Sequence, residues 1–376
     1  MSNGKTVHEP LFHISKRAPL SAWKAWLIRM GAVVAAIILS SLLIIGLTGQ
    51  NPVGIFNAAI KGAFGDVSSA DKGSGTRWEL VREWAILLSI AVAVTPAFKM
   101  KFWNIGAEGQ ALFGALAAAV FFKYCGSGFL VSDFGKVMLI LIMVALGFVA
   151  GAVWALIPAI FKAKWNTNET LFTLMMNYIA VRLVSVFLIT WDPDHKSFII
   201  SDETFSLMGN KYAWLVGVAL VITVIMFVYF KFSKHGYEIS VVGESKNTAK
   251  YIGINVTKIT LRTLILSGGL CGLIGGMLVI VKSSLGEGLI GGYGFTAILV
   301  SWLAKFNPLF MILTSFLVVF LQKGSSGIAD AYQRYNISKD FGDILVGIIF
   351  LFIIGCEFFL TFAIKKRKKK KEMKDE

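Results

Sequence analysis

The sequence predicts an all-α, polytopic transmembrane helical bundle of about ten spans, with both termini in the cytoplasm. Three observations predict this class: 56% of the 376 residues are hydrophobic, the mean hydropathy is +0.70, and only 16% of the residues are charged. No stretch of the chain is polar enough to build a separate water-soluble domain of ordinary size. The composition therefore excludes a fused ATPase, kinase or receptor ectodomain.

Each predicted span is a window of about 20 apolar residues, the length that an α-helix needs to cross the hydrocarbon core. The eighth and ninth windows are short, and Gly291, Gly292 and Gly294 make the eighth a candidate for a broken or re-entrant helix. The ten windows are residues 27–48, 80–98, 103–122, 137–162, 168–190, 213–232, 259–281, 289–304, 307–322 and 341–364.

The distribution of Lys and Arg predicts the orientation, because basic residues near the ends of spans are retained in the cytoplasm. With both termini inside, the cytoplasmic segments hold about 24 of the 37 basic residues and about 6 of the 22 acidic ones. Their net charge is about +18, against about −1 for the outer connections. Two cytoplasmic termini require an even number of spans, which favours ten.

The same pattern predicts the domain organisation. We expect a cytoplasmic N-terminal segment at 1–26, a transmembrane domain at 27–364 and a basic cytoplasmic tail at 365–376. The tail begins with seven consecutive basic residues, Lys365 to Lys371, which suit anionic lipid headgroups. The largest cytoplasmic connection is residues 231–258.

Histidine, cysteine and glycine patterns are unfavourable for catalysis by this chain. The cysteines are far apart and the histidines lie in polar connections, so the sequence predicts neither a metal site nor a catalytic residue. Gly135-Lys136 is followed by Val137 and lacks an upstream glycine, so there is no P-loop. The residues concerned are Cys125, Cys271, Cys356, His8, His13, His195 and His235.

Polar residues crowd the inner start of the third span, where Asn104, Glu108 and Gln110 fall within seven positions. Polar groups that enter hydrocarbon cost several kcal/mol unless they face protein or water. We therefore expect them to line a substrate pathway or to bind a neighbouring backbone. An interfacial helix start with a solvated Glu108 is the alternative.

A second polar group opens the fifth span. Glu169, Thr173 and Asn177 recur at i, i+4 and i+8, so they form one stripe along an otherwise apolar helix. Such a stripe must face the interior of the bundle. It has two interpretations that the sequence leaves open: direct contact with a transported solute, or hydrogen bonds to other helices.

The connection at 231–258 contains a predicted short helix. Ser245 or Asn247 can cap its start, and Gly253 can end it in a left-handed conformation. Its apolar tip at Tyr251 and Ile252 suits a groove on a cytosolic partner, and a solvated positive loop is the alternative. The predicted coupling residues are Gly243, Glu244, Ser245, Asn247, Ala249, Tyr251 and Gly253.

Gly268, Gly272 and Gly276 recur at four-residue spacing in the seventh span. Small residues at this spacing make a flat helix face and allow another helix to approach closely. We interpret these three glycines as a helix-packing surface.

Taken together, these motifs resemble the permease subunits of ATP-binding-cassette importers for simple sugars, nucleosides and branched-chain amino acids, and most of all the nucleoside permeases. The resemblance covers roughly residues 50–360. Trp103 departs from it, because the family usually has Phe there, and so does Leu303-Ala304, where Leu-Gly is usual. It is carried, in the family's order, by residues 104–110, 168–178, 243–256 with Ser267-Gly268, and 294–298 with Asn307-Pro308.

The resemblance implies a complex in the cytoplasmic (inner) membrane of a prokaryote. Its expected partners are a second homologous permease, cytosolic subunits that bind ATP and Mg²⁺, and an extracytoplasmic solute-binding protein or lipoprotein. The chain itself would bind no cofactor and have no enzymatic activity. Residues 243–253 would be the coupling helix seated in the ATPase. The implied solute is a nucleoside, with a sugar or a riboflavin-like compound as substitutes.

An ion-coupled secondary transporter is the main rival, with Glu108 or Glu169 as the proton or sodium site. Both glutamates lie near the cytoplasmic ends of their predicted spans, whereas a site near the middle of the bilayer would favour this rival. A membrane enzyme would need a convergent catalytic cluster within the spans, and a channel would need a charged ring; the sequence shows neither pattern.

Overall fold

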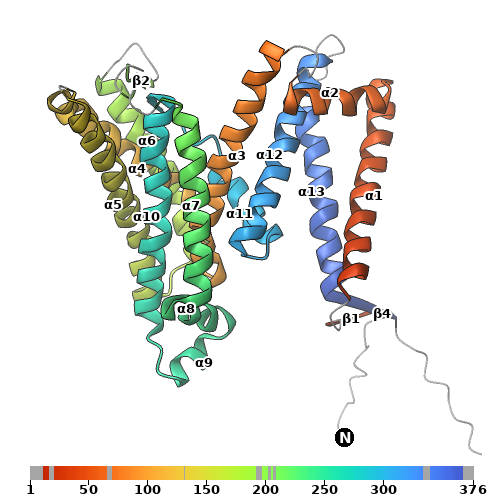
Figure 1. The fold of residues 1–376 in the computed structure, drawn as a ribbon. Helices are drawn as coiled ribbons and strands as arrows, with labels where there is room; N and C mark the ends of the chain where they lie inside the picture. Colours follow the sequence, from red (N-terminus) through yellow and green to blue (C-terminus); the bar gives the residue numbers. More distant parts are fainter. Residues whose placement is uncertain are drawn as a thin grey trace, which may run out of the picture. The chain divides into compact units, whose positions relative to one another are not determined.

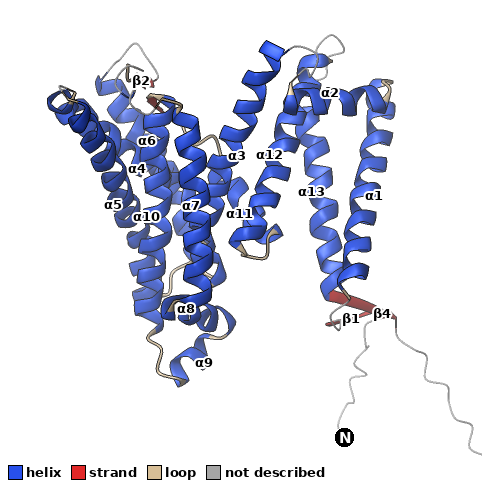
Figure 2. Cartoon of the chain, in the orientation of Figure 1, coloured by secondary structure: helices blue, strands red, loops and turns tan. Residues whose placement is uncertain are grey.

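The structure is a computed structural model that is predominantly helical (Figures 1 and 2). It describes residues 12–16, 21–65, 70–130, 132–191, 197–201, 205, 209–332 and 339–366. The basic run beyond Lys366 lies outside these residues. The chain divides into two compact units: one combines residues 1–63 with 321–376, and the other is the continuous segment 64–320.

The continuous unit contains most of the helices. Ser132 and Asn255 cap two of them, because each side-chain oxygen accepts a hydrogen bond from a backbone N–H in the first turn. The elements are α3 (Ala70–Lys99), α4 (Ala107–Cys125), η1 (Gly126–Phe129), α5 (Asp133–Trp165), α6 (Glu169–Trp191), β2 (Ser197–Ile199), α7 (Lys211–Phe232), α8 (Lys234–Glu244), α9 (Lys246–Tyr251), α10 (Val256–Lys282), β3 (Ser284–Gly286), α11 (Tyr293–Leu303) and the start of α12 (Pro308–Ala331).

Within the described residues, seven helices are long and apolar enough to cross a membrane, which makes the chain a multi-pass membrane protein. They are Thr76–Lys99, Ala107–Phe129, Asp133–Trp165, Glu169–Trp191, Lys211–Phe232, Val256–Lys282 and Pro308–Ala331. Three further apolar helical segments are shorter: Val34–Gly46, Tyr293–Leu303 and Gly347–Cys356. A helix lies in each of the ten predicted windows, while the crossing of all ten remains a prediction.

The eighth window holds α11, which has only 11 residues. Such a helix is about 16 Å long, roughly half the ~30 Å thickness of the hydrocarbon core. It starts where Gly291 and Gly292 have positive φ, a backbone conformation that glycine adopts at little cost. It ends where Lys305 and Phe306 also have positive φ. The segment is therefore a short helix between two sharp turns.

The core of this unit is centred on α10, which packs against α3, α4 and α5. A Cβ atom on Gly272 would lie 2.2 Å from the carbonyl oxygen of Gly147, and one on Gly275 would lie 1.8 Å from that of Ala111. Cβ atoms do not approach other atoms so closely, so α10 can only contact α5 and α4 here through glycine. Of the other two predicted packing glycines, Gly268 lies against Gly151 and Ala155, and Gly276 lies against Met143.

The second unit is built from both ends of the chain. Its core contains Ile44, Ile55, Ile328 and Leu345, and α1 packs against α13. The helix α2 was not predicted, because it falls between the apolar windows. The elements are β1 (Phe12–Lys16), α1 (Ala22–Thr48), α2 (Pro52–Phe64), the end of α12, α13 (Lys339–Thr361) and β4 (Phe362–Lys366).

The strands β1 and β4 pair in antiparallel register, with Ile14 opposite Ile364 (Figure 1). Because β1 precedes α1 and β4 follows α13, the start of α1 and the end of α13 lie beside each other. An even number of spans requires only that both ends lie on one side of the membrane, and this number stays a prediction. The side of the membrane on which these ends lie remains a prediction.

Candidate functional site

The connection between α3 and α4 is a partly buried, non-helical segment that carries the first polar motif. The backbone turns at Lys101, which has a φ of 58°, and continues without helical hydrogen bonds until α4 begins at Ala107. Backbone groups of such a segment need partners when they are removed from water. The predicted stripe on α6 supplies several of these partners.

Asn177 of α6 binds this segment at two points. Its Nδ2 donates a hydrogen bond of 2.9 Å to the carbonyl oxygen of Ile105, and its Oδ1 accepts one of 2.8 Å from the backbone N–H of Gly109. One turn earlier, the hydroxyl oxygen of Thr173 accepts a hydrogen bond of 3.2 Å from the N–H of Ile105. Both side chains are buried. They fasten the start of α4 to α6.

Asn104 and Gln110 bind each other through both ends of their amides. The Nδ2 of Asn104 donates to the Oε1 of Gln110 at 3.1 Å, and the Nε2 of Gln110 donates to the Oδ1 of Asn104 at 2.8 Å. Ser267 of α10 completes the group, at 3.4 Å from the Nδ2 of Asn104. Both amides are buried, so this pair closes the loop between α3 and α4 on itself.

Glu108 connects α4 to the start of α11. Its two carboxylate oxygens accept hydrogen bonds of 2.9 Å and 2.8 Å from the backbone N–H groups of Gly292 and Gly294. The first N–H groups of a helix have no partner within that helix, and negative charge is favourable at this end. A carboxylate from one helix therefore caps the N-terminus of another.

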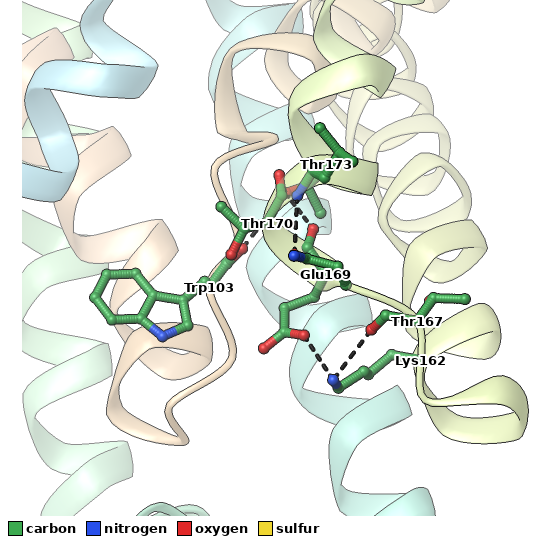
Figure 3. A network of polar contacts seen from close by, with 8 residues as sticks. Trp103, Lys162, Thr167, Glu169, Thr170 and Thr173 are labelled. Carbon is green, nitrogen blue, oxygen red and sulfur yellow. Dashed lines mark hydrogen bonds and ion pairs between the residues drawn. The ribbon is translucent and has the colours of Figure 1, made fainter.

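Glu169 is the first residue of α6 and lies one turn before Thr173 (Figure 3). Its carboxylate forms an ion pair of 2.7 Å with the ammonium group of Lys162, which also donates a hydrogen bond of 3.0 Å to the carbonyl oxygen of Thr167 (Figure 3). The hydroxyl of Thr173 donates to the backbone oxygen of Glu169 at 2.8 Å. This group fixes the turn between α5 and α6.

The structure thus brings all six predicted pathway residues to one region around the connection between α3 and α4. Their polar groups form hydrogen bonds or ion pairs with other parts of the chain. This agrees with the interpretation of the stripe as a set of hydrogen bonds to other helices. Contact between these six residues and a solute stays a prediction. Sequence reasoning did not pair Ser267 with Asn104, because a sequence motif on one helix carries no information about the partner helix.

The predicted coupling region folds as two short helices, α8 and α9. Ser245 begins α9, and its hydroxyl oxygen accepts a hydrogen bond of 3.2 Å from the N–H of Thr248. Gly253 ends the turn with a φ of 85°. Glu244 and Asn247 are exposed, and Tyr251 is 93% exposed. The tip of this region therefore presents an aromatic ring to its surroundings.

One expected coupling residue does not belong to the outer surface. Ala249 is 0% exposed and packs in a cluster with Met100 and Phe102 of the α3–α4 connection. Gly243 is also internal, because a Cβ atom there would lie 2.1 Å from the carbonyl oxygen of Lys99. The periodicity of a six-residue helix is too short to reveal from sequence which side faces inward. These two residues attach α8 and α9 to the bundle.

His235 joins α8 to two long helices. Its Nδ1 forms a hydrogen bond with the hydroxyl of Tyr229 on α7, and its Nε2 lies 3.5 Å from the hydroxyl of Thr263 on α10. Burial lowers the pKa of the His235 imidazole from its ordinary value, an effect that Arg262 adds to and Glu238 opposes. The imidazole is therefore neutral at neutral pH.

Comparison with known proteins decides the class of this bundle. Residues 79–354 match the family described as the branched-chain amino acid transport system permease component. The chain belongs to this permease family. It is therefore a transport subunit and not itself an enzyme.

Several named relatives are similar to this permease over nearly their whole lengths. It is 28% identical over 340 residues to the guanosine ABC transporter permease of Bacillus subtilis, covering 87% of this chain and 92% of the relative. It is 26% identical over 373 residues to the glucose ABC transporter permease of Haloferax volcanii, covering 93% of each. It is 25% identical over 363 residues to the nucleoside ABC transporter permease of Lactococcus lactis, covering 91% and 94%.

Proposed function

We propose that this chain is the membrane permease of an ATP-driven importer for a nucleoside, in the cytoplasmic membrane of a prokaryote. Its partners are a second permease, a cytosolic ATP-binding subunit that holds ATP and Mg²⁺, and an extracytoplasmic solute-binding protein. Two of the relatives are named for guanosine and for nucleosides, which supports this solute over the glucose of the third. A riboflavin-like compound remains a substitute, since a further relative is named a probable riboflavin import permease.

The observation that carries the proposal is that α9 has an exposed tip and an inner side that shares a buried cluster with the connection between α3 and α4. Tyr251 faces outward, while Ala249, two residues earlier, lies in the same buried cluster as Met100 and Phe102. Close-packed side chains transmit displacement, because the interior has few voids to absorb it. Movement of a partner docked on α9 would therefore displace the segment that Asn177 and Thr173 hold.

This arrangement supports a simple transport mechanism. Closure of the ATP-binding subunits around ATP moves α8 and α9, and the bundle changes between outward-facing and inward-facing states. Catalysis of ATP hydrolysis lies in the partner subunit. The permease contributes the path and the mechanical connection.

Ion coupling fits the contacts of Glu108 less well. An ion site would need carboxylate oxygens that are available to a proton or to sodium. Each oxygen of Glu108 instead accepts a backbone hydrogen bond at the start of α11. The carboxylate of Glu169 is paired with Lys162.

The test is uptake by proteoliposomes that contain the permease, its ATP-binding subunit and its solute-binding protein. We expect uptake of labelled guanosine or adenosine that requires all the subunits and internal ATP, and that persists when ionophores dissipate ion gradients. Glucose and riboflavin, tested in parallel, should be transported poorly. Uptake that follows an ion gradient without ATP would contradict the proposal, and transport of only glucose or riboflavin would reject the nucleoside.

A further inference from the structure

Arg182 lies deep within a membrane span. The helix α6 is apolar, with a mean hydropathy of 1.9 over its most apolar window, and Arg182 is 13 residues from its start. At the rise of an α-helix, this residue is about 20 Å from Glu169 and about 14 Å from Trp191. An arginine side chain is shorter than either distance, so its charge cannot reach the interface at either end of the span.

The side chain of Arg182 points away from the polar cluster. It follows Thr173 by nine residues, which rotates it by about 180° around the helix axis. Thr173 is buried against the α3–α4 connection, whereas Arg182 is exposed. The residues one turn before it and two turns after it, Tyr178 and Ile189, are 61% and 64% exposed. Arg182 is thus central to an open face of α6.

Arg182 is also unpartnered within the part of the chain that the structure describes. No described residue forms a hydrogen bond or an ion pair with its guanidinium group. A charged group in the middle of a bilayer is costly, and such residues face water-filled cavities or pair with other groups. The open face of α6 is therefore unsuited to lipid at this depth, although the residues around Arg182 are largely apolar.

We propose that the face of α6 formed by Tyr178 and Arg182 lines the aqueous pathway and contacts the transported solute. A guanidinium group has five N–H donors and no acceptor, so it selects solutes with carbonyl, hydroxyl or ring-nitrogen acceptors. The exposed ring of Tyr178, one turn away, offers a surface on which a planar heterocycle can stack. A nucleoside has both features, and this part of the inference rests on the proposed function.

This assignment changes which side of α6 serves transport. The stripe of Thr173 and Asn177 holds the bundle together, and the opposite side meets the solute. The motif stretches alone did not indicate this, because an isolated arginine makes no pattern. Its meaning depends on knowing that the surrounding helix face is open.

Cysteine labelling of the reconstituted importer tests the proposal. In a Cys125→Ser background, single Arg182→Cys and Tyr178→Cys variants are treated with a membrane-impermeant, charged thiosulfonate, with and without ATP. The matched control is Val224→Cys, near the middle of α7, where the side chain is exposed and its neighbours are apolar. We expect rapid modification at 182 and 178, protection of both by guanosine, and no modification at 224.

Uptake gives a second readout that does not depend on the cysteine variants. Arg182→Gln should raise the guanosine concentration for half-maximal uptake by about tenfold or more, as loss of a charged hydrogen bond predicts, and Arg182→Lys should be affected less. Assembly with the ATP-binding subunit should be unchanged. Unaltered uptake by Arg182→Gln would overturn the solute contact.

The labelling result and the proposed function can fail separately. Reaction at 182 and 178 no faster than at 224, in every nucleotide state, would overturn the aqueous lining even if wild-type uptake of guanosine is driven by ATP. A disulfide formed between two copies at 182 would place this face in a subunit interface and would also overturn it. Absence of ATP-driven uptake by the wild type would reject the function, while labelling still reports on the lining.

Discussion

The backbone nitrogen of Gly294 lies 2.8 Å from the carboxylate of Glu108 and donates a hydrogen bond to it. This contact joins two helices that are far apart in the sequence, α4 and α11. The other oxygen of the same carboxylate accepts a hydrogen bond from the backbone N–H of Gly292, two residues earlier. The short helix α11 is therefore capped from outside its own segment.

Replacement of Glu108 should destabilise the protein. Glu108→Ala leaves two backbone N–H groups at the start of α11 without their acceptor, at a cost of about 1–3 kcal/mol each. Glu108→Gln should cost less, because its amide keeps one acceptor oxygen. Thermal unfolding in detergent measures the loss, with Asp133→Asn, an exposed carboxylate, as the control. Equal stability of Glu108→Ala and the wild type would refute the capping role.

Asn177→Leu should reduce the amount of folded permease as well as its transport. The change removes the partners of the Ile105 carbonyl and the Gly109 N–H, both of which are hydrogen-bonded to this side chain. Gel filtration in detergent separates folded protein from aggregate, and Met175→Leu, on the exposed side of α6, is the matched control. Normal folding with abolished transport would instead assign Asn177 to the solute.

Tyr251 and Ala249 should respond differently to the same substitution. Tyr251→Asp alters only the exposed tip of α9, so the permease should fold normally and lose copurification with the ATP-binding subunit. Ala249→Asp places a charge in the core cluster, so it should lower the yield of folded protein. Tyr124→Asp is the control, because Tyr124 is an exposed aromatic residue near the C-terminal end of α4, away from α9. Retention of the ATPase and of uptake by Tyr251→Asp would reject the coupling surface.

Stability should fall in mild acid because of His235. Its pKa is lowered by burial in the folded protein, while the unfolded chain has the ordinary value of about 6.5. The unfolded state therefore binds a proton more readily, and stability is complete above pH 6.5 and decreases as the pH falls below it. Melting temperatures between pH 5 and 8 measure this, and His235→Gln should have a flatter profile. Identical profiles for the two proteins would show that His235 does not contribute.

Topology can be measured on intact cells with cysteines at two exposed positions. In a Cys125→Ser background, Ile199→Cys, in β2, should react with an impermeant maleimide, and Lys246→Cys, at the start of α9, should react only after permeabilisation. The expectation follows from the excess of basic residues on the side of α9. The reverse pattern would invert the orientation, and labelling of both from one side would exclude the predicted arrangement of spans.

Much of the fold was predictable because hydrocarbon imposes a simple length rule on helices. The windows at 27–48 and 213–232 coincide closely with α1 and α7. The unpredicted helix α2 has 13 residues, too few for a window chosen to span a bilayer. The glycines of the eighth window predicted a departure from helix there, and Gly291 and Gly292 do have positive φ just before α11 begins.

The sequence pointed to the polar residues of this cluster but not to their contacts. Polar groups at Asn104 and Asn177 were conspicuous because they interrupt apolar sequence. Their partners are backbone atoms of Ile105 and Gly109 and the side chains of Gln110 and Ser267, which only the packed helices reveal. The burial of Ala249 was equally hidden, since it depends on the α3–α4 connection.

The pairing of β1 with β4 makes assembly of the terminal unit wait until α13 and β4 have been synthesised. The helix α1 leaves the ribosome roughly 290 residues before α13 begins, which is about 15–60 s at typical elongation rates. During that interval the side chains of Ile44 and Ile55 lack Leu345, their partner in the core. A ribosome that stalls after α12 would leave α1 in the bilayer without its neighbour. The synthesis of α13 therefore sets the moment at which the first helix acquires its neighbour in the core.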